Sequence, residues 1–354
     1  MFLKNCWYCA GWDYEFSQGR DALIARTMAG EPLVLYRKPD GEVVAMEDRC
    51  CHRQAPLSLG SKEGDSIRCG YHGMLYGADG VCTEIPGQSM IPPKARVRTF
   101  PVVEKDNWIW VWMGDPVLAD PKHLCFAVGP SEPGWNVKTS KISMNTNHRL
   151  EIANLADLSH LTWVHKNTLG GSEDWVNAKT TITDLDRGIN TSFWLPNTPP
   201  ISFASHLFPP DTLFDVHASI DVTLPCNFVL HYQVWSQGTA AAGKENGELL
   251  LDSWTSQAVT PRDEDWVDYY YSWGLSDATD RPGMTDMLLE SVNDAFLEDK
   301  TVLEAQHARI KARPDGNMID IKHDAGPNRM LLLLDRFLEH ENSAMAQSPR
   351  VASN

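Results

Sequence analysis

Two short cysteine–histidine pairs constrain this chain more than any other feature of its sequence. The first pair is Cys50 with His52, and the second is Cys69 with His72, so the spacings are C-x-H and C-x2-H. Only 16 residues separate His52 from Cys69, and Gly, Pro and polar residues typical of loops lie close to both pairs. We therefore expect two loops to come together, each offering one thiolate and one imidazole to a metal centre.

This donor set suits a Rieske-type 2Fe-2S cluster, in which two cysteines hold one iron and two histidines hold the other. Replacing two thiolates by neutral imidazoles raises the reduction potential well above that of all-cysteine clusters, so the cluster can accept electrons from a ferredoxin-like donor. The alternative is a Cys2His2 zinc site. Zinc fingers usually place both cysteines in one loop and both histidines in the other, so the arrangement here favours the iron–sulfur cluster.

The other cysteines form no comparable set. Cys6 and Cys9 make a C-x-x-C motif, but no second half and no β-α-β unit follows, so core packing is expected for them. Core packing is expected equally for Cys51, Cys82, Cys125 and Cys226. The N-terminus is polar too early for a signal peptide and no apolar run approaches a membrane span, so we expect a cytoplasmic protein.

The overall charge narrows the range of partners. Lys and Arg number 31 against 47 Asp and Glu, which gives a net charge of −16. Such a charge argues against nucleic acid or an anionic membrane as a partner. An anionic redox protein would need a local basic patch on this chain.

The length of 354 residues predicts two domains, because it exceeds what one hydrophobic core usually organises. Short β-rich runs separated by turn signals fill residues 31–115 and predict a small all-β unit. The second half reads as α+β, with helices near 147–165, 284–311 and 327–341 and strand-like alternation from about 178 to 273. The expected division is 1–118, 119–341 and a disordered tail over 342–354.

A second metal site is indicated by the segment from Asn154 to His165. Asn154, Asp157 and His160 are spaced by three, which would place them on one polar line of a helix. His165 would lie about 140° further round an ideal helix, so both imidazoles reach one metal only if the helix widens or ends near 162–164. Two imidazoles and one carboxylate form the facial triad of non-haem Fe(II) oxygenases.

The carboxylate must come from elsewhere in the sequence. In the helix expected over 284–311, Asp299 lies on the apolar stripe, whereas Asp294 and Glu298 align with Glu290 on an acidic face. A carboxylate on a buried face is unfavourable unless it is paired, and a metal cation would pair it. Asp299 is therefore our candidate for the third ligand, with Asp294 or Glu298 as alternatives.

With both motifs in place, the chain resembles the oxygenase components of the Rieske non-haem iron oxygenases. Within them it resembles the group that includes vanillate O-demethylase, dicamba O-demethylase and toluenesulfonate methyl-monooxygenase. The likeness is carried by Asn5-Cys-Trp-Tyr, Cys50-Cys-His-Arg-Gln-Ala-Pro-Leu-Ser-Leu-Gly, Cys69-Gly-Tyr-His-Gly, Ile85-Pro-Gly-Gln, Phe100-Pro-Val-Val-Glu, Trp108-Ile-Trp-Val-Trp-Met-Gly-Asp-Pro, Asn154-Leu-Ala-Asp-Leu-Ser-His, Phe296-Leu-Glu-Asp-Lys and Asp324-Ala-Gly.

The resemblance implies a fold and a role for each motif. The fold would be a Rieske domain followed by a helix-grip, START-like domain with a curved antiparallel sheet. Asp157 matches the carboxylate that carries electrons between the cluster of one subunit and the iron of its neighbour, usually in a head-to-tail homotrimer, and Asn154 matches a residue near the iron. His148 departs from relatives, which commonly have Tyr or a similar residue there. The cluster ligands would be Cys50, His52, Cys69 and His72, and the iron ligands His160, His165 and Asp299.

The implied activity is hydroxylation of a small aromatic substrate, with O2 and with electrons that a ferredoxin or an NAD(P)H-linked reductase supplies. Either an O-methyl group would be lost as formaldehyde or an aryl methyl group would become an alcohol. No Lys or Arg suits a bidentate clamp on the expected sheet. The strand face that carries His231 points either to solvent or into the pocket, and in the second case His231 and Gln257 are the candidates for substrate binding. A neutral substrate or ring hydroxylation is the alternative activity. A pure electron carrier is a further alternative, but it would need only the first domain.

Overall fold

The computed structural model describes residues 1–17, 22–170 and 173–347, and these form two compact units. Unit 1 comprises Met1–Leu124 together with Thr260–Glu264, and unit 2 contains the remaining described residues. The division thus falls after Leu124, not after residue 118. The segment 260–264 belongs to unit 1 because the backbone amide of Ala29 donates to the carbonyl of Pro261 at 2.6 Å, a long-range contact that no local pattern signals.

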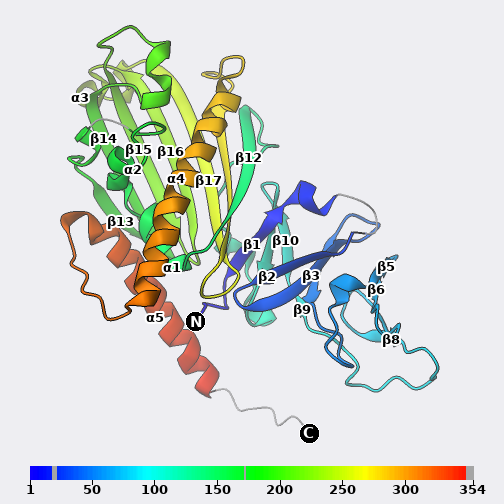
Figure 1. The fold of residues 1–354 in the computed structure, drawn as a ribbon. Coiled ribbons are helices and arrows are strands. Elements are labelled where there is room, and N and C mark those ends of the chain that lie inside the picture. The colour runs from blue at the N-terminus through cyan, green and yellow to red at the C-terminus, as the bar shows by residue number, and fades with distance from the viewer. Residues whose placement is uncertain (18–21, 171–172, 348–354) are drawn as a thin grey trace. The chain divides into compact units, whose positions relative to one another are not determined.

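Unit 1 is all-β, as the turn signals predict, and its described residues form three small sheets (Figure 1). The first sheet has the order β1-β11-β10, the second β2-β3-β4-β9, and the third β5-β6-β7-β8. Their bounds are β1 Trp7–Trp12, β2 Ile24–Met28, β3 Glu31–Arg37, β4 Val43–Glu47, β5 Ser61–Glu63, β6 Ser66–Arg68, β7 Leu75–Tyr76, β8 Cys82–Glu84, β9 Thr99–Phe100, β10 Val102–Lys105 and β11 Trp108–Trp112.

The cores of unit 1 explain why these short strands hold together. In the first sheet every residue of β1 and β11 is buried, and the Trp12 and Trp108 rings meet edge to face at 4.6 Å. A second cluster, which includes Tyr36, Leu57 and Ile67, also contains the candidate ligands Cys50 and Cys69. The two thiols are therefore anchored in a hydrophobic core and not on freely moving loops.

Unit 2 is built on one large sheet, which among the described residues has seven strands in the order β12-β18-β17-β16-β15-β14-β13. Strands β13 to β18 follow one another along the chain, and β12 pairs antiparallel with the last of them. The bounds are β12 Trp135–Met144, β13 Thr181–Leu185, β14 Gly188–Thr198, β15 Phe214–Thr223, β16 Asn227–Ser236, β17 Leu249–Pro261 and β18 Val267–Ser276.

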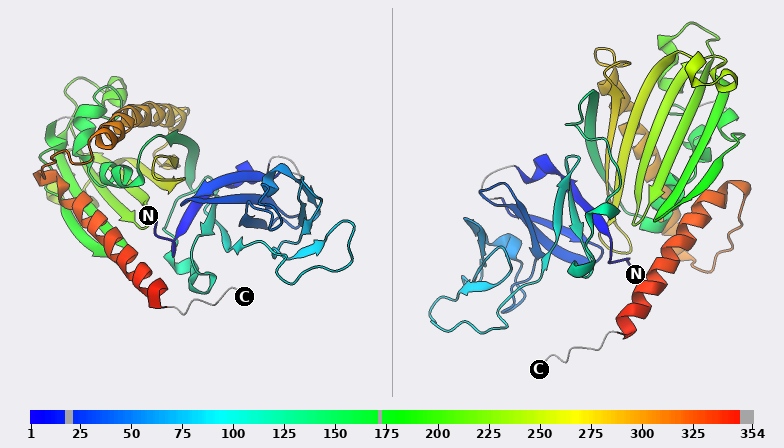
Figure 2. Two further views of the ribbon diagram at one scale, coloured as in Figure 1. Left: turned by 60° about the horizontal axis from the view of Figure 1, so that its bottom comes forward. Right: turned by 180° about the vertical axis from the view of Figure 1, so that it is seen from behind.

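Helices cover one face of this sheet. Helix α4 (Met284–Ala312) packs on β12 and β18, and α5 (Ala325–Gln347) packs on β14 and on α1 (His148–Leu155). Figure 1 shows α4 lying across the sheet, and the view from behind in Figure 2 shows the strands in front of it. Two single-turn helices complete the unit, namely α2 (Leu161–Val164) and α3 (Thr239–Ala242). An antiparallel sheet with helices packed on one face confirms the α+β class expected for this half of the chain.

Two expectations about helices were wrong. The helix expected over 147–165 is interrupted, because α1 ends at Leu155 and a 3-10 turn, Leu158–His160, separates it from α2. The tail expected to be disordered from 342 onward continues α5 as far as Gln347, and the part over 348–354 lies outside the described residues. None of the described helices combines the length and apolar character needed to cross a membrane.

Candidate metal centres

The two cysteine–histidine loops of unit 1 have the same backbone geometry. The amide of Cys50 donates to the carbonyl of Ala55 at 2.9 Å, and the carbonyl of Cys50 accepts from the amide of Gln54 at 2.9 Å. Cys69 repeats this pattern with Met74 at 2.8 Å and with Gly73 at 3.0 Å. Each loop turns through a left-handed residue at the equivalent position, Gln54 with φ 58° and Gly73 with φ 73°. Two loops with matching backbone hydrogen bonds thus each present one thiol and one imidazole, although the histidine lies two residues after Cys50 and three residues after Cys69.

Within each loop the thiol is buried and the imidazole is exposed. Cys50 and Cys69 are each 2% exposed and belong to the same buried cluster. The His52 and His72 rings lie at the surface with their centroids 4.6 Å apart. This order fits a cluster whose thiolate-bound iron lies inside and whose imidazole-bound iron faces solvent, where an electron donor can approach.

Burial and a neighbouring tyrosine define the surroundings of the thiols. Burial raises the pKa of the Cys69 thiol, and the neighbouring Cys50 raises it further. A metal bound here would remove the proton of this thiol. The hydroxyl of Tyr76 lies 3.1 Å from the Cys50 sulfur and 3.2 Å from that of Cys51, which provides the hydrogen bonding that tunes iron–sulfur potentials.

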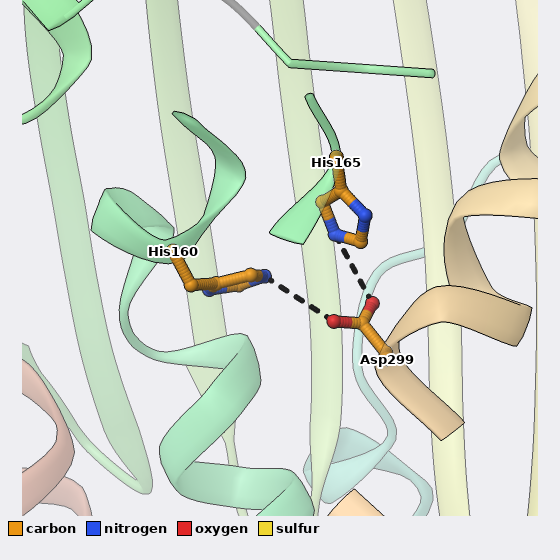
Figure 3. Close-up of side chains that lie close together, drawn as sticks. All are labelled: His160, His165 and Asp299. Atoms are coloured by element: carbon orange, nitrogen blue, oxygen red, sulfur yellow. Dashed lines mark ion pairs between the residues drawn. The ribbon is translucent and has the colours of Figure 1, made fainter. Parts of the chain in front are cut away.

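In unit 2 the structure brings His160, His165 and Asp299 together (Figure 3). Their donor atoms all lie within 4.8 Å of one another. The His165 Nε2 atom is 3.2 Å from one oxygen of Asp299, and the His160 Nε2 atom is 3.6 Å from the other. Asp299 is 5% exposed, as its place on the apolar stripe of α4 predicts. In a facial triad, two imidazoles and one carboxylate bind the same side of a metal ion, and these three side chains have that arrangement.

Interruptions of the helix, and not a widened helix, bring the two imidazoles together. Asp157 has an extended backbone. Its carboxylate accepts two hydrogen bonds from Ser159, one from the backbone amide at 2.8 Å and one from the hydroxyl at 2.9 Å. The chain therefore starts a new turn at Leu158 instead of extending α1. Helix α2 then ends at Val164, so that His165 leaves the helical path and turns toward His160.

Each ring of the triad is oriented through its second nitrogen. The His160 Nδ1 atom hydrogen bonds to the carbonyl of Asp157, and the His165 Nδ1 atom lies 3.0 Å from a carboxylate oxygen of Glu298. Both contacts leave Nε2 available for a metal. The side-chain amide of Asn154 donates to Asp299 at 3.2 Å and so fixes the third ligand as well.

The charges around the two imidazoles differ. Burial lowers the pKa of His160 and outweighs the nearby carboxylates, so this ring is a neutral donor. Burial also acts to lower the pKa of His165, but Asp299 and then Glu298 raise it overall. A protonated His165 would satisfy the two carboxylates in the absence of metal, and a divalent cation would replace that proton.

Comparisons with known proteins agree with both centres. The Rieske [2Fe-2S] domain model matches residues 6–101, and the vanillate O-demethylase oxygenase C-terminal domain model matches residues 144–340. The iron-sulfur subunit of the toluene-4-sulfonate monooxygenase system of Comamonas testosteroni is 35% identical over 98% of this chain and 100% of its own. The vanillate O-demethylase oxygenase subunit of a Pseudomonas strain is 31% identical over 97% of both chains.

The chain belongs to the Rieske non-haem iron monooxygenases, as an oxygenase component. Among solved structures, that of dicamba monooxygenase bound to dicamba matches with a TM-score of 0.85 and 28% identity over 97% of this chain and 99% of the other. These matches confirm the expected fold, enzyme class and cofactors, a Rieske 2Fe-2S cluster and Fe(II). An oxygenase component draws its electrons from a separate reductase or ferredoxin.

The triad of this oxygenase component lies on the wall of an apolar cavity of about 80 Å³. Gln257 lines the cavity, where it accepts a hydrogen bond from the Tyr269 hydroxyl and donates to Thr255 at 3.0 Å. His231 does not line it. Leu230 and Tyr232 do, and the side chain between them on β16 points to the opposite face of the sheet.

The expectation that His231 lines the pocket is therefore wrong. On its own face of the sheet, the His231 ring stacks on Trp254 with centroids 4.2 Å apart, and its Nε2 atom lies 2.6 Å from Asp252. Asp294, an alternative ligand, is exposed on α4 and is not part of the metal triad. Cys51 is exposed, and not packed in the core as expected.

Glu298 matches neither expectation for it, since it is not the third ligand of the triad and does not belong to a solvated face. Its spacings of eight from Glu290 and four from Asp294 predict such a face. Those two residues are exposed, whereas Glu298 turns inward to His165 and also accepts from the Thr168 hydroxyl at 2.7 Å. Its position directly before a buried Asp299 was the available signal.

Proposed function

We propose that this oxygenase component hydroxylates a methyl or methoxy carbon of a small aromatic substrate. The observation that carries the proposal is the metal triad on the wall of a cavity lined by aromatic and aliphatic side chains, including Trp175, Phe228 and Phe296. Such walls bind an aromatic ring and exclude water from the reaction. Relatives named for toluene-4-sulfonate, vanillate and dicamba support an aromatic substrate.

The residues divide the chemistry between the two units. Cys50, His52, Cys69 and His72 would hold the 2Fe-2S cluster, and His160, His165 and Asp299 would hold Fe(II). Fe(II) held by such a triad would keep coordination positions open for O2, and the cluster would supply the electrons for the reaction. Glu298 and Asn154 keep the donor atoms aimed at the metal.

We further propose that Asp157 carries electrons from the cluster of one subunit to the iron of another. The main-chain carbonyl of Asp157 hydrogen bonds to the ring of His160, which is a proposed iron ligand, and the Asp157 carboxylate is half-exposed. Asp157 therefore connects the iron site to the surface of the unit. This role requires an assembly in which a neighbouring subunit brings its cluster to Asp157, which supports a homotrimer. Gln257 lines the cavity and is the proposed polar contact to the substrate.

An electron carrier without oxygenase activity is the competing function. The triad argues against it, because a carrier has no use for a buried carboxylate placed against two imidazoles. Ring hydroxylation would need the same triad but a different substrate pose. A substrate screen separates these outcomes.

The test is O2 uptake by the full chain with a surrogate reductase and NAD(P)H. We expect uptake that depends on a methyl- or methoxy-substituted aromatic, with the alcohol or with phenol and formaldehyde as product. A visible spectrum should show the Rieske cluster. A colourless protein that contains zinc, or a cluster that cycles without any substrate-dependent O2 uptake, would reject the proposal.

A further inference from the structure

The exposed cysteine of the first cluster loop has no place in the core or in the proposed ligand set. Cys51 lies between the candidate ligands Cys50 and His52. Six of the eight cysteines are buried and Cys125 is intermediate, whereas Cys51 is exposed. A cysteine that packs as a small hydrophobic residue is normally buried, so packing does not account for Cys51. A contact made by its sulfur offers another account.

That contact is to Tyr76, whose hydroxyl lies among three sulfur atoms. The Tyr76 oxygen is 3.2 Å from the sulfur of Cys51, 3.1 Å from that of Cys50 and 3.7 Å from that of Met74. The Tyr76 side chain is fully buried, so its hydroxyl is held in this place. A phenol has one proton to donate, and its oxygen also accepts. Tyr76 can thus donate to one sulfur while it accepts from another.

The nature of the two cysteine sulfurs sets the direction of both hydrogen bonds. When Cys50 holds the cluster it does so as a thiolate, which is an acceptor only. Cys51 is not a proposed ligand and has an S–H group, which is a weak donor. The Tyr76 hydroxyl therefore donates to the charged Cys50 sulfur, which is a stronger acceptor than the neutral thioether of Met74. The Cys51 thiol in turn donates to the Tyr76 oxygen.

We propose, on the basis of the ligand set proposed above, that Cys51 is a positioning residue that raises the reduction potential of the cluster through Tyr76. Reduction adds negative charge to the cluster, and hydrogen bonds to its sulfur ligands stabilise that charge. A hydroxyl that accepts a hydrogen bond becomes a better donor, because linked hydrogen bonds polarise one another. The Cys51 thiol thus strengthens the hydrogen bond from Tyr76 to Cys50 and favours electron entry into the cluster.

The reduction potential of the cluster tests this inference without turnover. It is measured on the full chain with its cluster, by a redox titration followed by electron paramagnetic resonance. Tyr76→Phe should lower the reduction equilibrium constant about tenfold, or about 59 mV for one electron, because it removes the donor to Cys50. Cys51→Ala should lower this constant about twofold, or about 18 mV, because it removes only the polarising hydrogen bond.

Two further variants separate this effect from a change of structure. Cys51→Ser keeps a donor at the same position, so its potential should stay close to that of the parent and above that of Cys51→Ala. Tyr71→Phe is the matched control for the loss of a phenol near the cluster. The Tyr71 ring lies against the His72 ring, with centroids 3.9 Å apart, and is 59% exposed, so water solvates its hydroxyl. The potential of this control should equal that of the parent.

A double variant decides whether Cys51 acts through Tyr76. In a chain that already carries Tyr76→Phe, Cys51→Ala should leave the potential unchanged, since the group that transmits its effect is gone. A direct effect of the thiol on the cluster would instead lower the potential by the same amount in both backgrounds, and that result would overturn the proposed path.

An unchanged potential in Cys51→Ala would overturn the inference, as would a potential in Cys51→Ser as low as that in Cys51→Ala. If Tyr76→Phe fails to hold a cluster, the comparison of Ala with Ser at the exposed position 51 decides. A parent without the spectrum of a Rieske cluster would reject the proposed ligand set together with this inference. A normal Rieske spectrum with an unchanged potential in Cys51→Ala rejects the inference alone, so the two failures are distinguishable.

Discussion

The contact between Glu298 and His165 should control how tightly the mononuclear iron is held. Glu298→Gln keeps the size of the side chain but removes the negative charge that the His165 Nδ1 faces at 3.0 Å. The same carboxylate oxygen accepts from the Thr168 hydroxyl at 2.7 Å, so the neutral amide must also reorganise this second contact. Replacing the outer partner of a metal-bound histidine typically lowers metal affinity 10–100-fold. We expect a loss in this range, which corresponds to about 1.4–2.8 kcal/mol.

The measurement is an anaerobic titration of Fe(II) or Co(II) into protein that retains its cluster but has been depleted of mononuclear metal. The visible absorption of the cluster serves as an internal reference for protein concentration, because the cluster ligands lie in unit 1 and Glu298 lies in unit 2. Asp294→Asn is the matched control. It removes one negative charge from the same helix at an exposed position, and metal affinity should then change less than twofold.

Excess metal should restore turnover of the Glu298→Gln variant, because the iron ligands themselves remain. The reasoning is refuted if this variant binds metal as tightly as the Asp294→Asn control. The reasoning is refuted also if the Glu298→Gln variant binds mononuclear metal normally but loses the cluster absorption. The substitution would then not act through His165.

Three further variants probe the remaining parts of the centre. Asp299→Asn should lower mononuclear metal affinity by more than the 10–100-fold expected for an outer partner, with the cluster spectrum intact; metal analysis that still finds a full complement of iron would contradict it. Asp157→Asn should leave both metals bound but slow oxidation of the reduced cluster in a single turnover; an unchanged rate would exclude Asp157 from the electron path. Burial, and then Asp299, raises the pKa of the buried Glu151 well above its usual range. The stability that this protonated carboxyl contributes is full below its unfolded pKa of about 4.3 and is lost as the pH rises toward the folded pKa. Glu151→Gln should therefore raise the melting temperature of iron-free protein more at pH 8 than at pH 5, and an equal shift at both would contradict a protonated Glu151.

The cluster loops were the part of the molecule most open to prediction from sequence. Each loop encloses its own cysteine and histidine within a few residues, and its backbone closes through local hydrogen bonds such as that from Gln54 to Cys50. No distant contact is needed to place the donors of one loop. The α+β class of unit 2 followed in the same way, because strand alternation and helical stripes are also local signals.

The helix of the second site was predicted less well, since two local preferences compete there. Spacing by three from Asn154 to His160 is typical of one helix face, but Asp157 and Ser159 can form a turn of their own. The side-chain oxygen of Asp157 replaces the helical partner of the Ser159 amide, and the helix breaks. An aspartate two residues before a serine inside an apparent helix was a readable cap signal.

Which face of a strand meets the cavity could not be decided from the strand alone. Both faces of β16 carry large side chains, and His231 suits a polar pocket as well as a polar surface. The choice depends on where α4 packs, and that helix starts nearly fifty residues after β16 ends. For the same reason Glu298 could not be separated from its exposed neighbours, because only the position of His165 draws it inward.

The arrangement of α4 also explains why two consecutive acidic residues are placed where one would suffice as a ligand. Glu298 meets the Nδ1 side of the His165 ring, and Asp299 meets its Nε2 side at 3.2 Å. Consecutive residues of a helix project about 100° apart, so the two carboxylates approach the two ring nitrogens from different directions. One helix therefore sets both the orientation of the imidazole and the position of the carboxylate ligand. A shift of α4 would move Glu298 and Asp299 together, so it would change the orientation of the His165 ring and the position of the carboxylate ligand at the same time.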